Sequence, residues 1–191
     1  MQYWHKHCIA ICMINSAIRL LGLIVLLDAL PAASAMAGDW TAILNGKSYH
    51  VNSTYDWNEN NYGLGLEYAF DSQSRWKKTA MANGFRDSNN SMSYMAGAGL
   101  HRRIIETDRL SGFYVDAGIN AFVMTREDVK NNRPFPGLLP SISVGNQHVG
   151  LNLTYLPKRI VQDYLGANMA DPTISGILFI QFKVSVDLLL P

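Results

Sequence analysis

Apolar residues recur at every second position along most of the chain, and this period of two is the feature that most constrains the fold. In residues 113–124, one set of alternate positions is apolar, while the other includes Asp116 and Asn120. Residues 62–70 and 148–157 repeat the pattern. Successive side chains of a β-strand point to opposite faces, so this alternation predicts strands. The predicted strands are residues 40–51, 62–70, 75–87, 91–104, 110–124, 138–146, 148–157 and 173–184.

Two architectures can accommodate strands with one apolar face. A soluble sandwich would bury the apolar face between two sheets, whereas a transmembrane barrel would turn it to lipid and enclose the small or polar face. Most segments are close to the ~10 residues that a tilted strand needs to cross a membrane, and their second face is rich in small residues that suit a narrow lumen. We therefore predict an all-β protein, an eight-stranded antiparallel transmembrane β-barrel. Aromatic residues at the segment ends, as expected at membrane interfaces, are Tyr62, Tyr68, Phe70, Trp76, Tyr94, Phe113 and Tyr155.

The leader, residues 1–37, has the features of a secretory signal peptide. A basic residue precedes the apolar run Leu20–Leu27, and small residues follow it. Cleavage before Gly38 would leave residues 38–191 as a single barrel domain. A membrane anchor is the alternative, but the apolar run is shorter than the ~20 residues of a spanning helix. Met13 is an alternative start of translation.

Charge and cysteine content narrow the chemistry. The formal net charge is +1 and the sequence pI is about 7.8, which argues against a nucleic-acid partner because such partners usually need a basic face. Both cysteines, Cys8 and Cys12, fall in the leader. The mature chain should therefore have no disulfide, no thiolate nucleophile and no cysteine metal site, and we expect neither a metal nor a cofactor.

Prolines cluster where the sixth predicted strand begins. Pro134, Pro136 and Pro140 lie within seven residues, and Pro157 ends the seventh predicted strand. Proline lacks an amide hydrogen and cannot donate to a strand ladder. Two interpretations follow: the prolines mark strand ends, or they open a gap in the barrel wall through which a lipid could enter.

Several short blocks follow one another in an order that matches a known family. They are Asn58-Glu59 before Gly63-x-Gly65, "FRDSNNSMSYMAGAGL" (Phe85 to Leu100), "TREDVKNNRPFPGLLPSISVG" (Thr125 to Gly145), and Thr154-Tyr155-Leu156-Pro157. Together they resemble the outer-membrane lipid A palmitoyltransferases, the PagP family, over residues 50–184. The resemblance implies an eight-stranded outer-membrane barrel with an acyl pocket inside it, and we expect a monomer.

The resemblance also implies an activity and a site. Members of the family take a palmitoyl chain from the sn-1 position of a phospholipid donor and place it on a hydroxyacyl group of lipid A. Their functional residues are a histidine after the first strand and the aspartate and serine of a Phe-Lys-Asp-Ser motif, which correspond here to His50, Asp87 and Ser88. A family glycine at the position of Gly99 forms the floor of the acyl pocket. Gly97 and Gly99 share one face of their predicted strand, the inward one.

The residue types suit acyl transfer, but they also suit a plain turn. Histidine is a natural base near neutral pH, and a serine hydroxyl can act as nucleophile or as donor to an oxyanion. Asp87 and Ser88 are neighbours, so their side chains start in opposite directions and a linear Ser–His–Asp relay is not expected. An Asp-Ser-Asn-Asn run also favours a turn on propensity alone. His101 and His148, which also lie at strand ends, are assigned no role.

Two other functions remain open on the sequence. One is a small outer-membrane barrel without catalysis, serving in structure or adhesion. The other is a lipid A deacylase or phospholipase, which would use similar residues with water as the acceptor. The mass of lipid A from a host that expresses the protein distinguishes them from a transferase.

Overall fold

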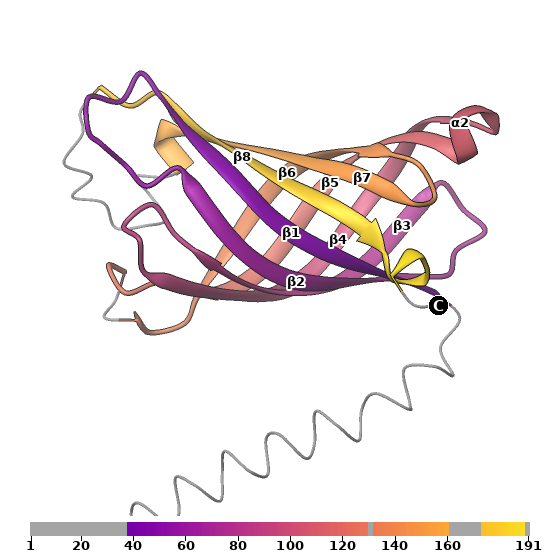
Figure 1. Cartoon of the computed structure of the whole chain (residues 1–191), viewed down its shortest axis with the longest axis horizontal. Coiled ribbons are helices and arrows are strands. Elements are labelled where there is room, and N and C mark those ends of the chain that lie inside the picture. The colour runs from indigo at the N-terminus through magenta and orange to yellow at the C-terminus, as the bar shows by residue number, and fades with distance from the viewer. Residues whose placement is uncertain (1–37, 130–131, 161–172, 190–191) are drawn as a thin grey trace, which may run out of the picture. The chain divides into compact units, whose positions relative to one another are not determined.

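The computed structural model describes residues 38–129, 132–160 and 173–189, which form a β-barrel (Figure 1). The predicted leader and both cysteines lie outside the described residues. The strands are β1 (Gly38–Val51), β2 (Asn60–Phe70), β3 (Trp76–Arg86), β4 (Met92–Thr107), β5 (Phe113–Thr125), β6 (Phe135–Gly145), β7 (Val149–Pro157) and β8 (Gly176–Ser185), with short helical turns α2 (Arg109–Gly112) and η2 (Val186–Leu188).

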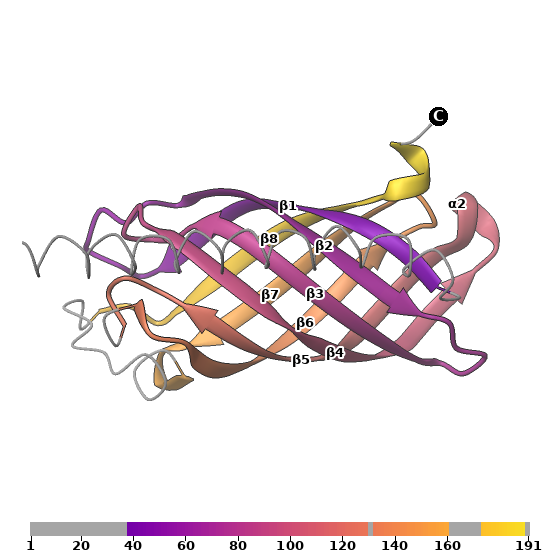
Figure 2. The ribbon, with the colours of Figure 1, turned by 90° about the horizontal axis from the view of Figure 1, so that it is seen from below.

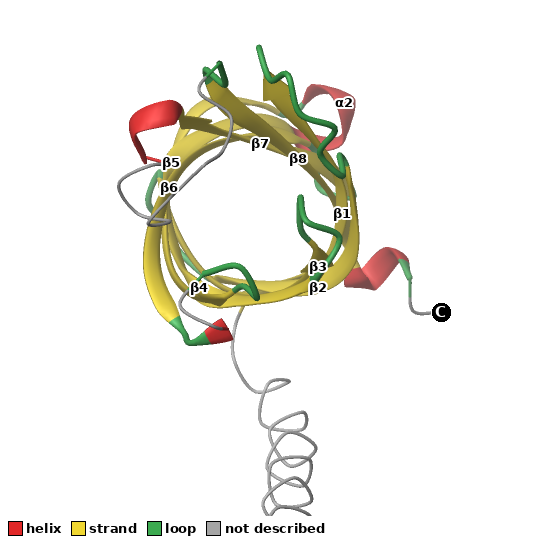
Figure 3. Cartoon of the chain, turned by 90° about the vertical axis from the view of Figure 1, so that its left-hand side faces the viewer, coloured by secondary structure: helices red, strands yellow, loops and turns green. Residues whose placement is uncertain are grey.

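Each strand pairs antiparallel with its neighbours in the chain, and β1 closes the barrel on β8. Figure 3 looks along the barrel and shows the closed ring, and Figure 2 shows the tilt of the strands. The prediction of an eight-stranded antiparallel barrel is confirmed, and every predicted segment corresponds to one strand. We call the end where β1, β3, β5 and β7 finish the upper rim, and the opposite end the lower rim.

Strand β5 starts three residues later than the alternation predicts. The preceding turn, α2, contains Leu110 and Ser111 at φ angles of 55° and 59°. Positive φ angles are incompatible with an extended strand. The apolar pattern therefore continues into a segment whose backbone has already left the sheet.

The outer face of the barrel is an apolar band between aromatic residues. Large side chains such as Leu64 and Val123 are 70% and 52% exposed on it. Exposed tyrosines lie near the upper rim, and Phe70 and Trp76 lie near the lower rim. This arrangement is the one that a barrel presents to membrane hydrocarbon and its two interfaces. Among the described residues, no helix is long and apolar enough to cross a membrane. The upper tyrosines are Tyr49, Tyr62, Tyr94 and Tyr155.

Paired charges and polar side chains fill the lower half of the lumen. Lys183 forms an ion pair with Glu67, and the Arg103 Nε donates to Asp116 Oδ1 at 2.6 Å. Buried charges are costly unless they are paired, and these four side chains are all at least 87% buried. The lower lumen is therefore a packed polar plug that links strands β2, β4, β5 and β8.

The barrel wall is incomplete between β6 and β7. Strand β6 pairs with β5 along its whole length, from Phe135 to Gly145, but with β7 only from Ser141 to Gly145. In the part of the chain that the structure describes, Phe135–Pro140 has no partner strand on the β7 side. The gap coincides with the predicted proline cluster: Pro136 and Pro140 lie within this segment, Pro134 just before it and Pro157 at the end of β7.

Candidate active site

A bulge in β1 turns His50 toward the lumen. Between Asn45 and Ser48, β1 advances one residue more than its partner β8, which runs from Gln181 to Phe179. Asn45 and Ser48 are both buried and inward, although strict alternation over three positions would put them on opposite faces. The extra residue shifts the alternation, so His50, two positions after Ser48, shares its inward face.

His50 meets Ser88 across the upper rim. The His50 Nε2 and the Ser88 Oγ are 3.0 Å apart, although the two residues lie 38 positions apart in sequence. The His50 side chain is only 2% exposed, and its ring stacks on Trp57 at 5.3 Å between centroids. A hydroxyl and an imidazole nitrogen at this separation have the geometry of a nucleophile beside its base.

Asp87 stabilises the turn that carries Ser88. Its side chain is 1% exposed, and its Oδ1 accepts the backbone amides of Asn89 and Ser91 at 2.9 and 3.1 Å. Its Oδ2 accepts the hydroxyl of Ser93 at 2.8 Å and lies 3.9 Å from the Nε of Arg126. The carboxylate is thus directed to its own turn, to β4 and to Arg126 just after β5, whereas the His50 ring bonds Ser88.

The loop after β1 is tied to the same turn. The backbone amide of Asn58 donates to the carbonyl of Ser88, and its side-chain amide donates to the carbonyl of Asp87, both at 2.9 Å. The Asn61 side chain donates to the carbonyl of Arg86 at 2.8 Å. These bonds hold the β1–β2 loop against the β3–β4 turn, and so hold His50 near Ser88.

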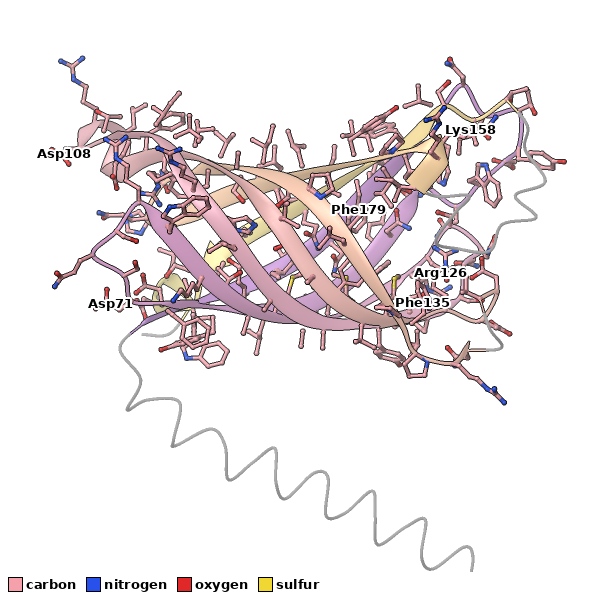
Figure 4. All side chains as sticks on the ribbon, turned by 180° about the vertical axis from the view of Figure 1, so that it is seen from behind. Asp71, Asp108, Arg126, Phe135, Lys158 and Phe179 are labelled. Atoms are coloured by element: carbon pink, nitrogen blue, oxygen red, sulfur yellow. The ribbon has the colours of Figure 1, made fainter. Side chains whose placement is uncertain are left out.

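An apolar pocket descends into the lumen from this rim. Ser88 and Asp87 line its mouth, and the side of the pocket reaches the unpaired segment of β6. Figure 4 shows Arg126, Phe135 and Lys158 at this end of the barrel and Asp71 and Asp108 at the other. The apolar lining includes Met81, Phe85, Met95, Phe122, Met124, Leu139, Leu156 and Phe179.

The deep end of the pocket lies at the level of the two predicted floor glycines. Gly97 pairs with Phe122, and Gly99 pairs with Asn120, and both partners line the pocket. A Cβ on Gly99 would lie 2.5 Å from Asn120 Oδ1. Asn120 in turn donates to Ser141 at 2.9 Å, which begins the polar plug. Apolar space therefore ends where this polar layer begins.

Sequence reasoning did not assign a role to Trp57 or Glu59, which contact His50, or to Arg126, which faces Asp87. The Glu59 Oε1 accepts the backbone amide of His50 at 3.0 Å. Two of the three stood inside blocks that the sequence singled out, Asn58-Glu59 and the "TRED" segment. The order of those blocks along the sequence drew attention to these segments. It gave no information on which side chains would lie in contact.

Fold and site together define a small membrane β-barrel that holds an apolar pocket under a histidine–serine pair. A model of the family described as "Antimicrobial peptide resistance and lipid A acylation protein PagP" matches residues 37–164. The chain belongs to this family, and the resemblance seen in the sequence is confirmed.

Individual relatives carry the same name. The lipid A acyltransferase PagP of Bordetella pertussis strain Tohama I is 32% identical over 123 residues, which cover 60% of this chain and 64% of that protein. The proteins of the same name from Proteus mirabilis and Methylobacillus flagellatus are 32% and 27% identical over 117 residues, 58% of this chain and 54% and 61% of theirs. The chain thus spans less than two thirds of the length of these relatives.

Proposed function

We propose that this protein is an outer-membrane lipid A acyltransferase that moves a palmitoyl-type chain from a phospholipid donor to lipid A. The observation that carries the proposal is the 3.0 Å contact between His50 and Ser88 at the mouth of an apolar pocket. Membership of the family and the name of its relatives support the acceptor. The proposal includes export by the leader, cleavage before Gly38, and action as a monomer.

The chemistry proceeds in two transfers. His50 Nε2 takes the proton of Ser88 as Oγ attacks the ester carbonyl of the donor, and the leaving lysophospholipid oxygen then takes that proton from His50. The hydroxyl of lipid A next gives its proton to His50 and attacks the acyl-serine carbonyl. Ser88 leaves and recovers the proton, so the enzyme returns to its starting state. In this scheme Asp87 acts indirectly, because it holds the turn that presents Ser88.

The lipid A of a Gram-negative host that expresses the protein tests this proposal. Mass spectrometry should find lipid A heavier by one fatty acyl chain, and lysophospholipid should accumulate in parallel. Lipid A lighter by one acyl chain would indicate a deacylase instead. Unchanged lipid A, with the folded barrel present in the outer membrane, would indicate a barrel without this catalysis.

Donor lipids are proposed to enter through the gap between β6 and β7. The prolines of this segment lack the amide donors that would pair with β7. Replacing Pro136 and Pro140 together by valine restores two donors and should narrow the gap. We expect a lower kcat/KM for a bilayer phospholipid and an unchanged rate with a short, detergent-soluble ester. Equal rates with the bilayer donor in variant and wild type would contradict lateral entry.

The floor at Gly99 is proposed to set the length of the transferred chain. A side chain there would push Asn120 into the deep end of the pocket, since a Cβ already approaches its Oδ1 to 2.5 Å. Gly99→Met should therefore shift the donor preference in a mixed-phospholipid assay to shorter chains. Ala98→Met, on the outward face of the same strand, is the matched control and should keep the wild-type preference. An unchanged chain preference in Gly99→Met would contradict this floor.

A further inference from the structure

We propose that Glu59 is a positioning residue for His50, so that Ser88, His50 and Glu59 form a serine–histidine–carboxylate line in which His50 carries the proton. The inference rests on the proposed acyl transfer. It assigns a role to the Asn58-Glu59 block, which is not among the predicted site residues His50, Asp87 and Ser88.

Two contacts join Glu59 to His50. The Glu59 Oε1 accepts the backbone amide of His50 at 3.0 Å, and the same oxygen lies 3.6 Å from the Nδ1 of the His50 ring. The Glu59 side chain is 38% exposed, whereas the ring is 2% exposed. One carboxylate oxygen therefore faces both the backbone and the inner nitrogen of a buried imidazole.

The proposed role of His50 as the base for Ser88 fixes which ring nitrogen carries the proton before the reaction. A hydroxyl that donates to Nε2 requires the neutral ring to carry its hydrogen on Nδ1. Nδ1 is the nitrogen that faces Glu59. Ser88, His50 and Glu59 thus have the donor–acceptor order of a serine–histidine–carboxylate triad, in which the carboxylate holds the tautomer and stabilises the imidazolium.

Asp87, the carboxylate that the family motif suggests for this role, is directed elsewhere. Its two oxygens accept hydrogen bonds from Asn89 and Ser91 in the Ser88 turn and from Ser93 in β4. It also faces the guanidinium of Arg126 at 3.9 Å. These contacts suit an anchor for the turn, whereas the carboxylate of Glu59 faces the Nδ1 of His50.

The position of Glu59 is fixed by its neighbours. Its backbone carbonyl accepts the amide of Ser48 at 3.0 Å, and the preceding residue, Asn58, is bonded to the carbonyls of Asp87 and Ser88. Adjacent residues of one loop therefore hold both halves of the His50–Ser88 pair. The 3.6 Å separation at Nδ1 is longer than a hydrogen bond, and we expect it to shorten when the ring becomes positively charged during the reaction.

Three substitutions separate the charge of Glu59 from its role in anchoring the loop. Glu59→Gln keeps an oxygen that can accept the His50 amide but removes the charge, Glu59→Asp keeps the charge on a shorter arm, and Glu59→Ala removes both. Glu127→Gln is the matched control, because Glu127 is another rim carboxylate and bonds the Ser91 hydroxyl. Steady-state rates with a phospholipid donor and purified lipid A give kcat and the donor KM separately.

We expect Glu59→Gln to lower kcat about 10- to 100-fold, less than the ~10⁴-fold loss for a fully buried triad aspartate, because Glu59 is partly exposed. The donor KM should stay unchanged, Glu59→Asp should recover part of kcat, and Glu127→Gln should match the wild type. Wild-type kcat in Glu59→Gln, with a loss only in Glu59→Ala, would overturn the proposal and leave Glu59 as a loop anchor. If the wild-type protein itself transferred no acyl chain, the proposed function would fail instead.

Discussion

Alanine at Ser88 or at His50 is expected to lower lipid A acylation about 10³-fold or more, because each removes one member of a nucleophile–base pair. Without His50, the Ser88 hydroxyl loses the base that lies 3.0 Å away. Without Ser88, that base has no serine hydroxyl to activate. The double variant should be no slower than the slower single variant, because residues that act as a unit lose their contribution together. Rates of acyl transfer from a phospholipid to purified lipid A provide the measurement.

His148→Ala is the control for this pair. His148 is exposed and precedes β7 at the lower rim, at the opposite end of the barrel from the upper-rim turns. Its loss should leave acylation at the wild-type rate. The scheme is also testable by mass spectrometry, because an acyl-serine on the peptide that contains Ser88 should accumulate when lipid A is withheld. Retained acylation in both single alanine variants would exclude this site.

Inserting one alanine between Ser48 and Tyr49 is expected to lower acylation as far as His50→Ala does, although His50 itself is still present. The inserted residue adds one step to the alternation after the inward-facing Ser48, so regular pairing with β8 would carry His50 to the outer face. The imidazole would then point to the membrane interface, away from Ser88. The barrel should still assemble, because the strand pairs that do not include β1 are unchanged.

Lys47→Ala is the control at the bulge, because it changes a side chain of β1 without changing the number of residues in the strand. This variant keeps the extra residue and should retain wild-type acylation, since Lys47 is exposed and its ammonium lies 5.9 Å from the Tyr49 ring. The folded state of both variants can be followed by their thermal unfolding in detergent. An insertion variant that folds and acylates lipid A normally would show that the alternation of β1 after the bulge does not orient His50.

Strand positions were predictable because each face of each strand meets a different environment. Leu64 and Val123 face outward and Asp116 and Asn120 are buried in the lumen, as their alternation requires. Single departures have local causes: positive φ angles at Leu110 and Ser111 delay β5. The composition of a face is a local property of the sequence, and for that reason it can be read without the fold.

The candidate site was predictable in part. His50 and Ser88 were named through the resemblance, and the structure brings them together. Glu59 was noticed as part of a block but without a role, and its proximity to the His50 ring depends on how the loop returns over the rim. Such contacts join segments far apart in the chain, so no local pattern reports them.

By itself, the sequence determined the number of strands, their approximate ends and the face that each residue occupies, because a strand repeats every two residues whatever its neighbours are. Tertiary structure alone decided which way His50 points. Its orientation depends on the one-residue mismatch between β1 and β8, which exists only when two strands from opposite ends of the chain pair to close the barrel. The pairing with Ser88 and Glu59 follows from that closure.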